Sequence, residues 1–193
     1  ITSKEIKGIE ALGFQAEKVY SGKSDSYKFY DLGSDNYGVG TSTGIDELTG
    51  ESILKFDDKN MNLKNDIKAT FDQVTGLDTD SGKMFRLYNA SFKRLPDPDG
   101  LRYWIGNFSS GKDDERAVAS SFLASAEFKE RYGEDVSNES YVNTLYINVL
   151  GRDYDQAGYE YWLSNLNSGD ETKYELLLGF SESVENKRIL SEM

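Results

Sequence analysis

The chain of 193 residues contains no cysteine, no histidine and only two prolines. Without cysteine it forms no disulfide, no thiolate zinc site and no cysteine nucleophile. The absence of histidine excludes every catalytic scheme that needs imidazole as an acid, a base or a metal ligand. No apolar run approaches the roughly 20 residues of a membrane-spanning helix, so we expect no membrane insertion.

Basic residues are also scarce. The chain has 22 basic and 34 acidic residues, which gives a net charge of −12. Nucleic acid and anionic membrane surfaces repel such a chain, and we expect neither as a partner. Two interpretations of the charge stay open. It can serve solubility alone, or it can belong to a secreted chain that meets abundant Ca²⁺.

Residues 1–76 are rich in Gly, Asp, Asn and Thr and contain short apolar or aromatic clusters. Turn residues at 33–36 and 57–60 separate these clusters, which is typical of strands in a small antiparallel sheet. The predicted strands are 17–20, 27–32, 37–40 and 51–56. Short helices are predicted at 2–12, from capping-box spacing, and at 65–74.

The most informative feature of the chain is an internal repeat, in which residues 87–128 and 145–186 match without a gap at an offset of 58. A repeat of fixed period indicates one supersecondary unit used twice. The identical positions are Leu87/Leu145, Tyr88/Tyr146, Arg94/Arg152, Asp97/Asp155, Gly100/Gly158, Tyr103/Tyr161, Trp104/Trp162, Asn107/Asn165, Ser110/Ser168, Gly111/Gly169, Phe122/Phe180, Ser125/Ser183 and Glu127/Glu185.

Apolar residues after residue 82 recur at helical spacing, with glycines where helices must stop and serines where short helices begin. This pattern therefore predicts about four helices in each repeat. We expect an α+β fold, in which a small N-terminal antiparallel β region (1–76) precedes an all-α domain of about eight helices. That double-repeat domain spans 82–193, with repeat one at about 82–133 and repeat two at about 138–193.

The most specific string of the chain reads R-x-x-D-x-x-G-x-x-Y-W and occurs twice. Its fixed points are Arg94, Gly100 and Trp104 in the first repeat, and Arg152, Gly158 and Trp162 in the second. L-Y precedes each string, and N-x-x-S-G and F-x-x-S-x-E follow it. The whole pattern resembles the bacterial domain of unknown function 4214, and both repeats match it. The chain departs from that pattern at Lys93, where the family has glycine, and at Asn186, where it has phenylalanine.

The family resemblance implies a large secreted protein, because these domains often stand beside RTX-type calcium-binding repeats. Residues 45–50 and 52–58 resemble the D-T-L-x-x-V-E-R-L-x-F-x-D-G segment that follows such repeats, although no intact G-G-x-G-x-D nonapeptide is present. The same helical outline is more distantly similar to phycobilisome linker domains. We take that likeness as a shared fold, which does not imply shared function.

Each Arg/Asp pair of the motif has two interpretations. The arginine can bind the aspartate three residues later and fix the loop, while the aspartate caps the next helix. Alternatively, Asp97 with Asp99, or Asp153 with Asp155, can contribute to an irregular Ca²⁺ site. An EF-hand is excluded, because loop position 12 is not glutamate. Trp104 and Trp162 are predicted to pack in the core, with a carbohydrate-stacking platform as the alternative.

These observations favour a non-enzymatic structural or interaction module at the end of a large secreted or cell-surface bacterial protein. The resemblance implies type I secretion, no established cofactor with Ca²⁺ as the only candidate, and an unidentified protein or glycan at the cell surface as partner. An intracellular scaffold of phycobilisome-linker type is the alternative. A glycoside hydrolase that uses paired carboxylates ranks lower, because no carboxylate lies in a string typical of a buried acid.

Overall fold

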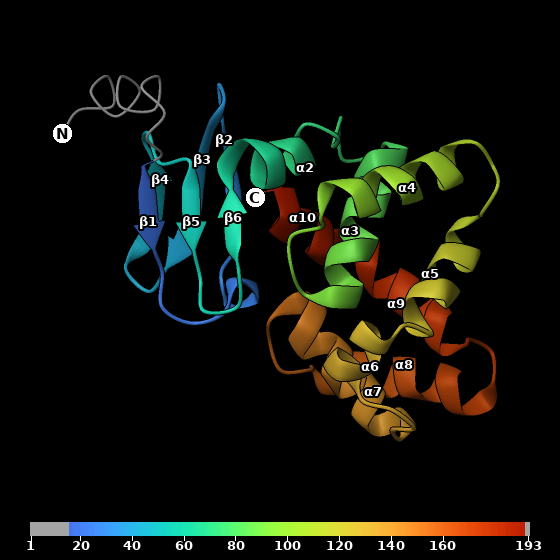
Figure 1. Cartoon of the computed structure of the whole chain (residues 1–193). Coiled ribbons are helices and arrows are strands. Elements are labelled where there is room, and N and C mark those ends of the chain that lie inside the picture. Colours follow the sequence, from blue (N-terminus) through green and yellow to red (C-terminus); the bar gives the residue numbers. More distant parts are fainter. Residues whose placement is uncertain (1–15, 192–193) are drawn as a thin grey trace. The chain divides into compact units, whose positions relative to one another are not determined.

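The computed structural model describes residues 16–191 (Figure 1), so the helix predicted at 2–12 lies outside the described residues. These residues divide into two compact units. The first unit holds the described chain up to Gln73, together with Arg94–Asp99. The second holds Val74–Lys93 and the described chain from Gly100 onward. The α+β class predicted from the sequence is confirmed, with small sheets first and helices after them.

The first unit contains two small sheets. One has the order β1-β5-β6, with β1 (Glu17–Val19) parallel to β5 (Ile53–Lys55) and β5 antiparallel to β6 (Asn60–Asn62). The other is an antiparallel meander of β2 (Phe29–Gly33), β3 (Asn36–Thr41) and β4 (Gly44–Leu48).

The single antiparallel sheet expected from the sequence is therefore wrong in two respects. The structure has two sheets, and β1 pairs in parallel. Sequence analysis also missed β4 and β6. In β4 the acidic pair Asp46-Glu47 obscures the apolar alternation, and β6 reads Asn-Met-Asn, which has little strand propensity of its own. Both strands are fixed by pairing with a neighbour, and pairing often outweighs intrinsic propensity in sheets.

A half-buried carboxylate lies within the first unit between strands of its two sheets. Asp46 of β4 accepts a hydrogen bond of 2.7 Å from the Tyr20 hydroxyl and forms an ion pair of 2.6 Å with Lys18 of β1. Burial opposes ionisation of Asp46, but the hydrogen bonds from Lys18 and Tyr20 lower its pKa below the ordinary value. Tyr20 also stacks on Phe56, with ring centroids 5.3 Å apart.

The first unit ends in a short helical segment, made of the π-helical turn η2 (Leu63–Lys68) and α2 (Ala69–Phe71). Asn62 caps it by accepting from the Asn65 amide. The sequence predicted a helix at 65–74, and the structure places one there, shifted toward the N-terminus.

The second unit is helical, as predicted. The helices of the repeats are α3 (Asp80–Phe92), α4 (Pro98–Ser109), α5 (Glu115–Leu123), α6 (Ala126–Tyr132), α7 (Asn138–Leu145), α8 (Gln156–Ser168), α9 (Lys173–Ser181) and α10 (Val184–Ser191). The π-helical turn η3 (Tyr146–Leu150) continues α7, so α7 and η3 together correspond to α3.

The repeat seen in the sequence is reproduced in the contacts. Helix starts are capped at equivalent positions, by Thr79 and Ser137, by Asp114 and Thr172, and by Ser125 and Ser183. Ring contacts are equivalent too: Tyr88–Phe122 and Tyr146–Phe180, and Trp104–Phe122 and Trp162–Phe180. The same packing solution is therefore used twice.

The two repeats close on each other instead of stacking as an open array. Helix α6 of repeat one packs against α7 of repeat two, and α10 of repeat two packs back against α3 of repeat one. The equivalent helices α5 and α9 also pack together (Figure 1). Neither repeat can bury its apolar face alone, and closure lets each cover the other.

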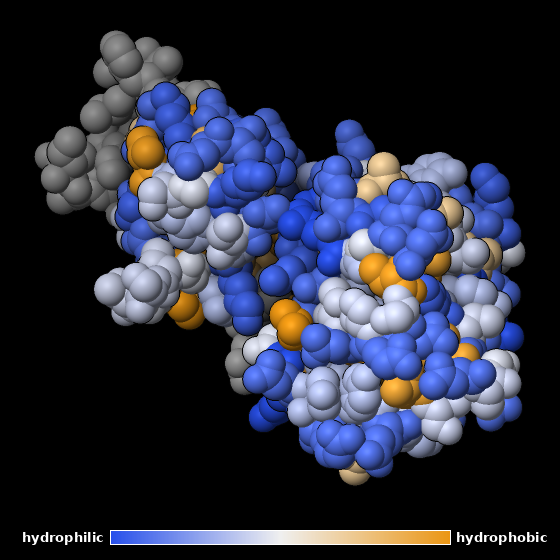
Figure 2. Space-filling model, turned by 90° about the horizontal axis from the view of Figure 1, so that it is seen from below, coloured by the Kyte–Doolittle hydropathy of each residue, from blue (hydrophilic) through white to orange (hydrophobic). Residues whose placement is uncertain are grey.

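The two motif tryptophans lie at the edge of this core. Trp104 on α4 and Trp162 on α8 are partly buried, and neither belongs to the fully buried set that includes Leu101 and Phe180. Figure 2 shows a mostly hydrophilic surface on which apolar residues are scattered. Within residues 16–191, no helix is long and apolar enough to cross a membrane.

The ends of α3 and η3 show one local difference between the repeats. Gly151 follows η3 with a φ of +67°, and Lys93 follows α3 with a φ of +52°. Glycine adopts this left-handed conformation without steric cost, whereas a side chain pays about 1 kcal/mol. Lys93 therefore occupies a helix-terminal position whose left-handed backbone conformation favours glycine.

Lys93→Gly is expected to raise the free energy of unfolding by about 0.5 kcal/mol, because it relieves this strain at some cost in chain entropy. Gly151→Ala, the converse change in the other repeat, should lower it by about 1 kcal/mol. Urea denaturation of the full chain measures both. Equal stability of all three proteins would contradict the assignment of Lys93 as a strained helix end.

Candidate functional site

The motif loop of the second repeat is organised by Arg152. Its Nε and Nη2 donate to the two carboxylate oxygens of Glu185, at 2.7 and 3.0 Å. Its Nη1 donates to the Asp153 carbonyl at 3.0 Å and reaches Asp155 only at 3.5 Å. The predicted Arg152–Asp155 contact is therefore present at the limit of a hydrogen bond, while the bidentate partner is Glu185 of α10.

Asp155 has the second role expected of it, because its side chain caps α8 by accepting from the Gly158 amide at 2.8 Å. Gly158 must be glycine here, since a Cβ on it would lie 2.3 Å from the Tyr146 hydroxyl. The motif residues of repeat two thus join the loop, α8 and η3.

Hydrogen bonds set the acidity of both carboxylates in this loop. The pKa of Glu185 is lowered mainly by the hydrogen bonds from Arg152, against a smaller opposing effect of burial. The pKa of Asp155 is lowered mainly by the Gly158 amide. Both groups are stabilised as anions by the folded chain.

The equivalent loop of the first repeat belongs to the first unit. Nη1 of Arg94 donates to the Leu95 carbonyl at 3.1 Å and reaches Asp97 at 3.5 Å. The predicted Arg94–Asp97 contact is thus also at the limit of a hydrogen bond. Leu95 and Pro96 are buried, and the α2 region covers the loop through Thr70, whose hydroxyl donates to the Pro96 carbonyl at 2.8 Å.

The four aspartates considered as calcium ligands are not gathered into a site. Among residues 16–191 the structure contains no group of three or more acidic side chains arranged to hold a metal ion. Asp155 caps α8, and Asp97 contacts Arg94. Asp99 lies in the first turn of α4, and Asp153 is exposed.

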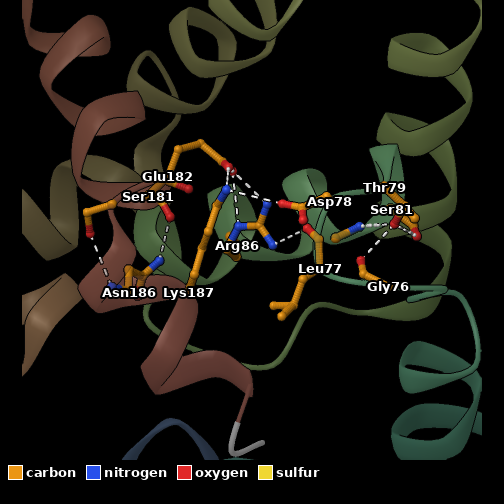
Figure 3. Close-up of polar contacts among 12 residues, drawn as sticks. Gly76, Leu77, Asp78, Thr79, Ser81, Arg86, Ser181, Glu182, Asn186 and Lys187 are labelled. Atoms are coloured by element: carbon orange, nitrogen blue, oxygen red, sulfur yellow. Dashed lines mark hydrogen bonds and ion pairs between the residues drawn. The ribbon is translucent and has the colours of Figure 1, made fainter.

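A polar cluster around the buried Arg86, which sequence analysis missed, joins the two repeats (Figure 3). Nε and Nη2 of Arg86, on α3, donate to both carboxylate oxygens of Glu182 at 3.1 and 2.9 Å. Nη1 donates to the Leu77 carbonyl at 2.6 Å. The Arg86 side chain is only 2% exposed. Lys187 of α10 lies 3.3 Å from Asp78 and 3.6 Å from Glu182.

The repeat alignment contained a signal for this cluster. Arg86 aligns with Thr144 and Glu182 aligns with Ala124. Each charge is thus a departure from the repeat, and the two departures are complementary. Asn186 is a third departure, because its side chain is buried and donates to the Ser181 carbonyl at 2.8 Å, where the first repeat has Phe128 stacked on Tyr132.

The comparison with known families recognises the second repeat. Residues 119–190 match the family described as "Domain of unknown function (DUF4214)". The chain matches no curated protein and no solved structure. The sequence analysis expected two copies of the family's unit, and the comparison matches one.

The matched segment does not begin where repeat two begins. It starts within α5 and ends within α10, so the match includes the end of α5 and all of α6 from repeat one, together with most of repeat two. Helices α3 and α4 lie outside it. Even so, α3 packs against α5, α6, η3, α9 and α10, and 10 of its 13 residues are buried.

Stability should depend on pH through Glu185. Its pKa is below the ordinary value of 4.5 in the folded chain, so the unfolded chain binds the proton more tightly. The contribution of Glu185 is therefore complete above about pH 4.5 and is lost as the pH falls through its folded pKa. Glu185→Gln should lower the melting temperature at pH 7 and flatten its decline below pH 4.5.

Glu130→Gln, at an exposed position of α6, is the matched control and should leave the profile close to that of the native chain. Thermal melts from pH 3 to pH 7 measure the three profiles. If Glu185→Gln and Glu130→Gln gave the same profile, the ion pair with Arg152 would have no role in stability.

Proposed function

We propose that this chain is a non-enzymatic structural or interaction module of a large secreted or cell-surface bacterial protein. The proposal rests on the structural roles of the residues that are identical in both repeats. Leu87/Leu145 and Phe122/Phe180 fill the core, and Ser125/Ser183 cap helices. Residues retained in both copies thus hold the helices together, which is the work of a scaffold.

We further propose that α3 to α6 are a diverged second copy of the DUF4214 unit. Equivalent caps and equivalent ring contacts support this reading. The departure at Lys93 lies at the end of α3 and gives one reason why repeat one differs from the family pattern.

The RTX association belongs to the same proposal and is supported by the segment at 52–58. Its two aspartates fix a loop of the first unit. Asp57 accepts from the Gly22 amide at 3.0 Å, and Asp58 accepts from the amide and hydroxyl of Ser24, both at 2.7 Å. A role in closing a β region is consistent with a segment that follows calcium-binding repeats.

Cell fractionation tests where the protein works. Antibodies against this chain should detect the parent protein in the culture medium, or on intact cells in a form that added protease removes. A cytoplasmic marker protein controls for lysis. Detection only in the cytoplasm would overturn the secreted assignment and favour an intracellular scaffold.

The second test measures whether the folding and the melting temperature of the chain depend on Ca²⁺. The helical repeats bury a continuous apolar core, and burial of that kind suffices for folding without an ion. The chain should therefore be folded in excess chelator, and millimolar Ca²⁺ should raise its melting temperature by no more than about 3 °C, with Mg²⁺ as the control. An unfolded chelated state, or a large shift specific to Ca²⁺, would make calcium structural here.

A further inference from the structure

The motif loop of the first repeat is a docking site for a helix of the same chain. The Thr70 hydroxyl donates to the Pro96 carbonyl at 2.8 Å, and Nε2 of Gln73 donates to the Pro98 carbonyl at 2.9 Å. The two donors are three residues apart: Thr70 lies in α2 and Gln73 in the turn that follows it. Pro96 and its neighbour Leu95 are buried.

The loop of the second repeat that corresponds to residues 94–99 is exposed. Tyr154 and Gln156 correspond to Pro96 and Pro98. The Tyr154 side chain is 40% exposed, and all six residues of 152–157 are exposed. Arg152, Asp155 and Glu185 hold this loop in place, so it is a fixed surface.

Two exposed apolar residues are sequence neighbours of residues that hold this loop, at positions where the first repeat has smaller or polar ones. Ile147 stands in place of Asn89 and is 42% exposed, and Val184 stands in place of Ala126 and is 85% exposed. Ile147 follows Tyr146, which Arg152 covers at 5.2 Å. Val184 precedes Glu185, the bidentate partner of Arg152. Both therefore lie within one residue of the network that holds the loop.

We propose that residues 152–157 dock a short amphipathic helix of a protein partner, in the way that residues 94–99 dock η2–α2. The partner helix carries hydroxyl or carboxamide donors three residues apart, directed at the loop carbonyls. It also carries a basic residue, because Asp153 replaces the apolar Leu95 of the first repeat. This inference names a partner for the proposed interaction module and rests on that function.

A peptide of residues 60–76 is the probe, because it contains the helix that the first loop binds as well as Lys64 and Lys68. Added to the full ¹⁵N-labelled chain, it should shift the backbone amide resonances of residues 153–157. The first loop already has its own helix in place. The variant Asp153→Leu/Tyr154→Pro/Gln156→Pro copies the first loop into the second and should bind the peptide at least about fivefold more tightly.

The matched control is the same peptide with Thr70→Val and Gln73→Leu, which removes both donors and keeps the apolar face. It should bind the native chain at least about fivefold more weakly. Equal binding of the two peptides, or shifts that avoid 153–157, would overturn the docking site. That result would leave the fractionation experiment unaffected, so failure of the docking site and failure of the secreted assignment are distinguishable.

Discussion

The helical unit depends on one ion pair, in which the buried Arg86 of α3 binds the half-buried Glu182 at the end of α9 through two hydrogen bonds. Transfer of a guanidinium out of water costs several kcal/mol, and only a well-placed anion with further hydrogen bonds offsets that cost. Glu182 and the Leu77 carbonyl supply these partners. The ion pair therefore constrains how repeat one closes on repeat two, since other arrangements of the helices would leave Arg86 buried without a partner.

This constraint explains why two similar repeats form an asymmetric pair. At the equivalent junction the residues are Thr144 and Ala124, which carry no charge. The ion pair thus distinguishes the α3–α9 contact from its counterpart. It also makes α3 a necessary part of the unit, although the DUF4214 match begins only in α5. The boundary of the family is therefore not the boundary of the packed core.

The sequence was sufficient to predict the helical half and insufficient for the β half, for a physical reason. Helices are coded locally, by apolar spacing and caps such as Ser125 and Ser183, and these were confirmed. Strands β4 and β6 have weak strand signals of their own and form by pairing with the strand that precedes each, and the parallel pairing of β1 with β5 joins strands that are far apart in the sequence. The candidate site divides in the same way: Arg152 and Asp155 were identified from local spacing, whereas Glu185 and Glu182 lie on helices that only the fold brings close.

A double-mutant cycle tests most directly the claim that the Arg86–Glu182 pair fixes the closure of the two repeats. Glu182→Gln alone leaves a buried cation without its anion and should lower the free energy of unfolding by about 3 kcal/mol. Arg86→Met/Glu182→Gln removes the cation as well and should recover most of that loss. A coupling energy of about 2 kcal/mol or more supports the claim. Additive effects, or a Glu182→Gln chain as stable as the native one, would contradict it.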